Sequence, residues 1–178
     1  DGDGDVDVLS ASSSDDTVAW FENDGSQSFA ERVISDSANG ARCVYATDVD
    51  GDGDVDALSA TSEIAGVIAW HENDGQQSFA EHVITDARQY SRTVVAADVD
   101  GDGDVDALQA TSASDPFVEW YENDGEQSFT GHVITTQATG GFNMVVADVD
   151  GDGDLDPPCR RPPPTTRWPG SRTTAPNP

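Results

Sequence analysis

Acidic residues at every second position dominate one nine-residue stretch of the chain, Asp-Val-Asp-Gly-Asp-Gly-Asp-Val-Asp, at 48–56. The stretch recurs unchanged at 98–106 and with one Val→Leu change at 148–156, and the chain opens on a copy without the first two residues. Carboxylates at this density suit a hard cation, and Ca²⁺ takes about six to eight oxygens from a loop that curls around it. Because crowded carboxylates repel one another unless a cation neutralises them, we expect Ca²⁺ to be the cofactor.

In the copy at 48–56 we predict carboxylate ligands from Asp48, Asp50, Asp52 and Asp56, and a backbone carbonyl ligand from Asp54. Glycine between the acids permits the sharp turn that such a loop needs. The same positions of every copy give the predicted metal residues: Asp1, Asp3, Asp5, Asp7, Asp48, Asp50, Asp52, Asp54, Asp56, Asp98, Asp100, Asp102, Asp104, Asp106, Asp148, Asp150, Asp152, Asp154 and Asp156.

Two other interpretations of these loops remain to be weighed. One is an acidic, glycine-rich surface turn that binds nothing. The other is an EF-hand, which needs a bidentate glutamate at loop position 12 and helices on both sides. Position 12 is Ser59, Gln109 or Cys159, and the flanking residues alternate like strands, so we reject the EF-hand.

The loops are embedded in a repeat of 50 residues. In one repeat, four short runs rich in β-branched and aromatic residues are separated by turn residues: 43–47, 57–61, 67–72 and 78–84. The acidic loop joins the first two runs, and Asn-Asp-Gly joins the last two as a hairpin signal. Four antiparallel strands per repeat of this length predict an all-β fold of propeller blades, with the calcium loop in the first hairpin of each blade.

Three segments of the repeat, DVDGDGDVDAL, AWHENDGQQSF and HVIT, resemble the FG-GAP/VCBS repeat family, whose propellers include the integrin α-subunit head. The resemblance covers 1–156 and implies a calcium-stapled propeller, usually of seven blades, in a secreted or cell-surface protein. We divide this region into a partial blade at 1–42, two blades at 43–92 and 93–142, and the start of another at 143–156. Since propellers close with about four to eight blades, we expect an incomplete propeller.

Composition narrows the range of partners. The chain has 178 residues, with 35 acidic residues against 8 arginines, and a net charge of −27. Such a surface repels nucleic acid and anionic membranes, and no stretch is long and apolar enough to insert into a bilayer. The segment 157–178 is rich in proline and arginine, so we expect a disordered tail, or an artefact of the gene model that a frameshift would explain.

No catalytic constellation stands out, because Ser, His and Asp recur in repeated copies whereas an enzyme site is asymmetric. The sequence favours a calcium-dependent module that binds extracellular proteins or glycans. The alternatives are a fragment of a propeller lyase or dehydratase acting on sugars, with its active site in missing blades, and an architectural spacer. Open blade edges also predict self-association.

The tryptophans at the same place in each repeat, Trp20, Trp70 and Trp120, fit packing between blades better than sugar-stacking platforms. The next residue in each copy is Phe, His or Tyr, and we expect it to be a semi-exposed aromatic position. The histidines His82 and His132 are expected on the surface of a strand.

Overall fold

The computed structural model describes residues 1–62, 66–112, 116–138, 143–151 and 155. These residues form eleven strands and no helix. The strands make three antiparallel sheets, which we name A, B and C. Sheet A contains β1 (Val8–Ser12), β2 (Thr17–Asn23) and β3 (Phe29–Ser35); sheet B contains β4 (Ala41–Thr47), β5 (Asp56–Thr61), β6 (Gly66–Asn73) and β7 (Phe79–Arg88); sheet C contains β8 (Ser91–Ala97), β9 (Asp106–Thr111), β10 (Val118–Asn123) and β11 (Phe129–Thr135).

The strands in each sheet pair in chain order, as expected for propeller blades. In sheet B, Leu58 of β5 lies between Tyr45 of β4 and Trp70 of β6, so consecutive hairpins build the whole sheet. The four expected runs of sheet B are all strands, and the structure confirms the all-β fold class. Sheet A has three strands and lacks a counterpart of β4.

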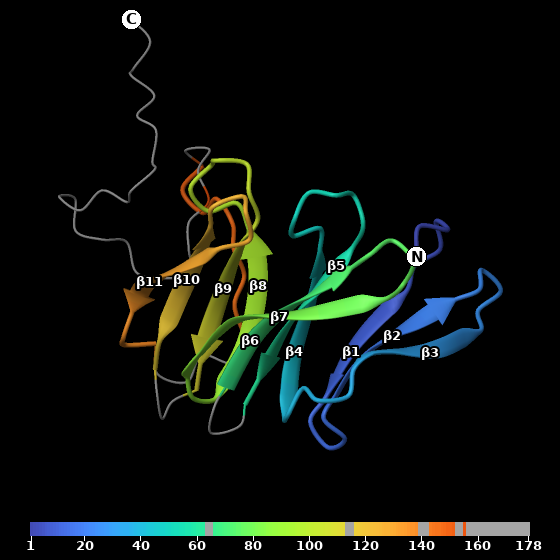
Figure 1. Ribbon diagram of the computed structural model, residues 1–178. Coiled ribbons are helices and arrows are strands. Elements are labelled where there is room, and N and C mark those ends of the chain that lie inside the picture. Colours follow the sequence, from blue (N-terminus) through green and yellow to red (C-terminus); the bar gives the residue numbers. More distant parts are fainter. Residues whose placement is uncertain (63–65, 113–115, 139–142, 152–154, 156–178) are drawn as a thin grey trace, which may run out of the picture.

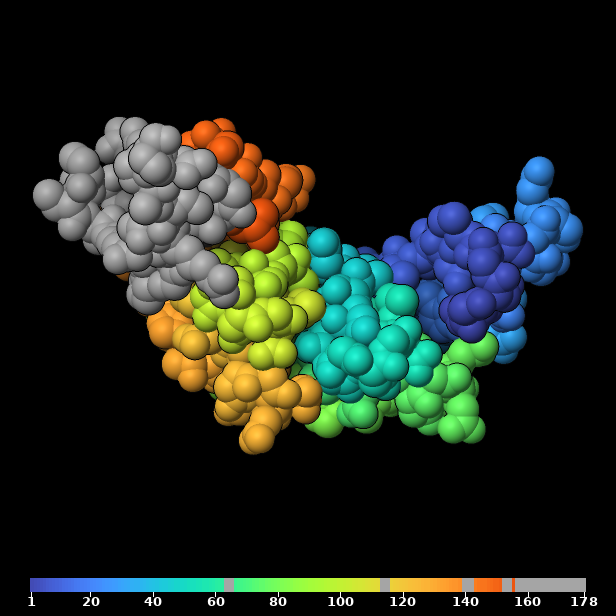
Figure 2. Space-filling model, turned by 90° about the horizontal axis from the view of Figure 1, so that it is seen from above, coloured from blue at the N-terminus to red at the C-terminus, as the bar shows by residue number. Residues whose placement is uncertain are grey.

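The three sheets follow one another as a row that does not close into a ring (Figures 1 and 2). The loops between β4 and β5 and between β8 and β9 project from one end of the sheets, beside the amino-terminal segment (Figure 1). The architecture is therefore that of an incomplete propeller. Among the described residues, no helix is long and apolar enough to cross a membrane.

The hydrophobic core lies between the sheets rather than inside any one of them. Leu58, Ile68 and Trp70 of sheet B form one buried cluster with Val94 and Tyr121 of sheet C. A second cluster contains Trp120 of sheet C, and a smaller one lies between sheets A and B. The prediction that the tryptophans pack between blades is confirmed, because all three are at most 6% exposed.

The expected strand at 143–147 is wrong, because only Ala147 makes a bridge there. The run that should pair with it would begin after Asp156, where the chain continues with Pro157 and Pro158, and proline has no amide proton to donate to a sheet. Met144 nevertheless packs against sheet C. The predicted tail at 157–178 lies outside the described residues.

Candidate metal centre

The acidic loop of sheet B begins after β4 and ends at Asp56, the first residue of β5. Gly51 and Gly53 have φ of 78° and 98°, a conformation that side chains disfavour. They turn their amides toward Asp48, whose two carboxylate oxygens accept hydrogen bonds from Gly51 at 2.8 Å and Gly53 at 3.0 Å. The loop therefore curls around its own first carboxylate.

Three carboxylates meet inside the curl. One oxygen from each of Asp48, Asp50 and Asp56 lies within 4.8 Å of the others, and the loop of sheet C brings together the equivalent group, Asp98, Asp100 and Asp106. An all-oxygen, all-carboxylate donor set suits a hard cation such as Ca²⁺. The chemistry of the residues thus fits the metal expected from the sequence.

The other acids of the loop lie differently. The carboxylates of Asp52 and Asp54 are not part of the group of three. The Asp54 carboxylate lies against Gly75 of the Asn-Asp-Gly turn, which leaves its backbone carbonyl as the group able to face the loop interior. Three of the four predicted carboxylates are therefore brought together, whereas Asp52, the fourth, lies outside the group, as does its counterpart Asp102 in sheet C.

The first and last loops are less complete. Among the described residues, Asp1, Asp3, Asp5 and Asp7 do not form such a group. The amino group of Asp1 lies 3.7 Å from the Asp7 carboxylate instead. In the last loop, Gly51's counterpart Gly151 donates to Asp148 at 2.7 Å, as in sheets B and C. The predicted ligands Asp152, Asp154 and Asp156 lie outside the described residues.

The pKa values of the clustered acids show the strain of gathering negative charge. Burial raises the pKa of Asp50, and the neighbouring Asp52 and Asp48 raise it further. Burial raises the pKa of Asp56, and in sheet C it raises that of Asp106 to about 6, despite backbone hydrogen bonds that oppose the shift. A bound cation would favour the ionised forms and remove this cost.

An asparagine that the sequence interpretation treated as a simple turn residue ties the metal loop to the second hairpin. The backbone amide of Asn73 donates to Asp56 Oδ1 at 2.8 Å, and its side-chain amide donates to the Val55 carbonyl at 3.1 Å. Its side-chain oxygen accepts a bond from Gly75 at 3.2 Å. The same three bonds recur at Asn23 and Asn123. The 50-residue recurrence was the signal that could have identified this role.

The tryptophan of each sheet is buried in the core beside the acidic loop. Trp70 is 3% exposed, and its ring stacks on His82 with centroids 4.6 Å apart. Its indole Nε1 lies close enough to Asp56 to lower the pKa of that carboxyl, although it meets no acceptor with hydrogen-bond geometry. Rings buried this deeply offer no open face to a sugar. His82 lies on the surface as expected and pairs with Glu72 at 2.8 Å.

The residue after each tryptophan corrects a second expectation. His71 is 1% and Tyr121 is 6% exposed, so this position is buried in sheets B and C, whereas Phe21 of sheet A is partly exposed as expected. The buried position lies on the face of its sheet opposite to the tryptophan, and that face receives the preceding sheet. The sequence pattern could not show this, because both faces of an inner blade are covered.

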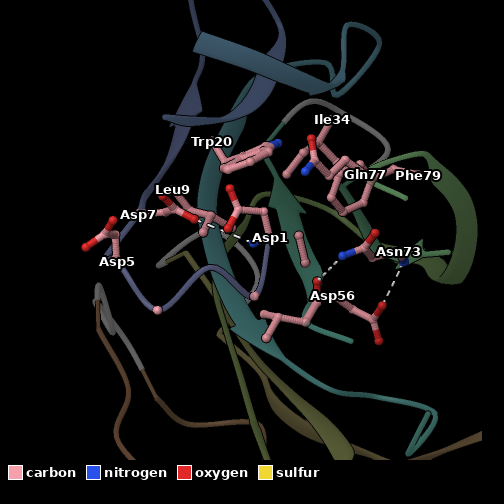
Figure 3. Close-up of a pocket in the computed structure, with 14 residues that line it drawn as sticks. Asp1, Asp5, Asp7, Leu9, Trp20, Ile34, Asp56, Asn73, Gln77 and Phe79 are labelled. Carbon is pink, nitrogen blue, oxygen red and sulfur yellow. Dashed lines mark hydrogen bonds and ion pairs between the residues drawn. The ribbon is translucent and has the colours of Figure 1, made fainter. Parts of the chain in front are cut away.

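A pocket of about 330 Å³ opens between the first acidic loop and sheet B (Figure 3). Trp20 and Phe79 supply aromatic lining, and Asn73 and Gln77 supply amides. Asp1, Asp5 and Asp7 lie along one side of it (Figure 3). Aromatic and polar side chains therefore converge in this pocket.

A family model described as an FG-GAP-like repeat matches residues 1–59, 48–109 and 110–156. The chain belongs to the FG-GAP repeat family. The resemblance seen in the sequence is thereby confirmed. FG-GAP repeats often bind calcium and are typically extracellular, which agrees with the acidic clusters. No curated protein matches the chain.

Proposed function

We propose that this FG-GAP chain is a calcium-stapled module that presents a blade surface to extracellular protein or glycan partners. The observation that carries the proposal is the recurrence of one three-carboxylate cluster at the same point of sheets B and C. Each cluster is enclosed by a single hairpin and braced by the adjacent turn through Asn73 or Asn123. A cation there would hold two hairpins of one blade together, as expected of a structural ion.

The burial of one carboxylate in each cluster argues against a metal that performs chemistry. Catalytic metals keep an open coordination position for water or substrate. Asp56 and Asp106 are each 1% exposed and use their carboxylates to accept backbone amides. We therefore place partner recognition on the blade surfaces and assign the ions to stability.

Calorimetric titration with Ca²⁺ tests the metal assignment. We expect uptake with a Kd of about 10⁻⁴–10⁻³ M, as in other extracellular modules. At a free Ca²⁺ concentration of ten times Kd, each site stabilises the fold by about 1.4 kcal/mol. Asp50→Asn should remove one site from the stoichiometry, whereas Asp54→Asn, whose carboxylate lies outside the cluster, should leave the number of sites unchanged. Absence of uptake, or equal effects of the two variants, contradicts the assignment.

A glycan array and a panel of immobilised extracellular proteins, each with and without Ca²⁺, test the partner class. Capture that needs Ca²⁺ and proceeds without turnover supports the module. Turnover of a polysaccharide by the chain alone would refute it. If a glycan is captured, loss of binding in Phe79→Ala with retention in Phe129→Ala, its counterpart in sheet C, would locate the contact in the pocket.

A further inference from the structure

A polar cluster without a counterpart elsewhere among the described residues joins sheet B to sheet C. Arg88, the last residue of β7, donates to both oxygens of Glu119 in β10, through Nε at 2.8 Å and Nη2 at 2.5 Å. The guanidinium also lies 3.9 Å above the ring of Phe117. The ion pair therefore crosses the junction between two blades with bidentate geometry.

The Glu119 carboxylate accepts further hydrogen bonds from its own sheet. Glu119 Oε2 also accepts a bond from the side-chain amide of Gln109 at 3.0 Å and one from the Tyr121 hydroxyl at 3.0 Å. Gln109 in turn accepts a bond from the Ser91 hydroxyl at 2.8 Å, and its amide contacts the Tyr121 hydroxyl. Because every acceptor is already occupied by protein donors, the cluster has no free position for a ligand and acts as a contact between sheets.

The electrostatics agree with a satisfied pair. Burial alone would raise the pKa of Glu119, but the hydrogen bonds from Arg88 and Tyr121 outweigh it and the pKa is lowered. Glu119 is 5% exposed, whereas the Arg88 side chain is 27% exposed. The carboxylate thus depends on its partner far more than the guanidinium does, since only the latter can reach water.

The junction between sheets A and B has different chemistry at the same repeat positions. Ala38 occupies the position of Arg88, and Ala69 occupies that of Glu119, each buried. Arg88 ends strand β7, whereas Ala38 lies in the segment that follows β3, although a residue with positive φ stands two positions later in both places, Gly40 at 66° and Tyr90 at 57°. The two junctions therefore differ in chemistry, one apolar and one charged.

We propose that the Arg88–Glu119 cluster is a recognition element that specifies which blade packs on sheet C. A sheet that brings alanine at the arginine position would leave Glu119 buried without a cation, a strongly unfavourable state. Sheet C therefore accepts a neighbour of the sheet B type and rejects one of the sheet A type. In a chain of near-identical repeats, such a rule opposes the packing of a wrong blade on sheet C, including a blade from another copy of the chain.

A double-mutant cycle in the full chain tests the pairing. Arg88→Met should lower the melting temperature by roughly 6–20 °C, because it orphans a buried carboxylate. Glu119→Gln should cost less, because Arg88 keeps access to water. The double variant should be more stable than Arg88→Met alone. Additive losses, or the reverse order of the single variants, would overturn the proposal.

A transplant of the charge to the other junction tests specificity rather than stability alone. Ala69→Glu places a carboxylate in sheet B where sheet A offers Ala38, and we expect a loss of the same size as for Arg88→Met. Adding Ala38→Arg should recover at least half of that loss, whereas Ala38→Met should not. If Ala69→Glu is tolerated alone, or if arginine recovers no more than methionine, blade choice does not depend on this pair and the proposal is wrong.

Discussion

His71 makes the stability of the chain depend on pH. The ring is 1% exposed at the junction of sheets A and B, and its Nε2 lies 3.0 Å from the Ser59 hydroxyl. Burial, with a smaller contribution from the charge on His82, lowers the pKa of His71 from 6.5 to about 4. The folded protein therefore holds this histidine neutral at a pH where the unfolded chain protonates it.

The sign and size of the effect follow from these two pKa values. Between pH 6.5 and pH 4 the unfolded state binds more protons at this residue, so stability falls as the pH falls. From pH 7 to pH 5 the loss from His71 is about 2 kcal/mol, on the order of a fifth of the stability of an ordinary domain. Asp106, whose pKa is raised to about 6, acts in the opposite direction in the same window, because its stabilising effect is present at low pH.

Urea denaturation in calcium-free buffer at pH 7 and pH 5 isolates the histidine if it compares the native chain with His71→Phe. Phenylalanine is the residue that sheet A carries at this position, Phe21, and it cannot be protonated. We expect the native chain to lose about 2 kcal/mol more than the variant between the two pH values, since all other groups cancel. Equal pH dependence of the native chain and His71→Phe would refute the reasoning.

Three further changes probe the bracing of the metal loop. Asn73→Ala removes the bonds to Val55 and Gly75 and should lower the free energy of unfolding by about 1–3 kcal/mol and weaken Ca²⁺ binding in calorimetry, whereas Asn39→Ala, at an exposed turn, should do neither. Gly125→Ala should destabilise the chain by more than the roughly 1–2 kcal/mol that a positive φ costs, because the added Cβ would come 2.7 Å from a carboxylate oxygen of Asp104. Gly101 has a φ of 79° but open space around it, so Gly101→Ala should lower the free energy of unfolding only by the cost of the positive φ. Chelation should increase amide exchange in the loops of both sheets B and C, and unchanged exchange would speak against ions in these hairpins.

The repeat made the fold predictable. A 50-residue period with four short β-branched runs leaves little choice but a four-stranded blade, and the acidic loop fell in the first hairpin as expected. The run at 143–147 failed for a reason that lies outside it, because a strand needs a partner and the residues after Asp156 bring proline. The residue pattern of a segment predicts its tendency to adopt an extended conformation, whereas pairing into a sheet also depends on the sequence of the partner strand.

The loop that gathers carboxylates was predictable, with three of its four predicted carboxylates in the cluster, but the supports of the loop were not. Alternating aspartates identify a cation loop, yet they do not show that Asp54 turns toward Gly75 and away from the other carboxylates. That detail depends on the second hairpin lying beside the first, which is a tertiary contact. The burial of His71 and Tyr121 was missed for a similar reason, since alternation on a strand predicts one covered face and an inner blade has two.

Repetition and asymmetry have separate places in this chain. The metal loops and their asparagine braces are copied from sheet to sheet, because each blade must close the same hairpins. The differences lie in buried polar pairs: Ser59 with His71 inside sheet B, and Glu119 with Arg88 between sheets B and C. Blades that share the same loops and hairpins differ from one another only in the residues of the faces that contact the neighbouring sheets. The positions that distinguish one blade from another should therefore be sought where sheets meet, and the acidic loops should tolerate exchange between blades.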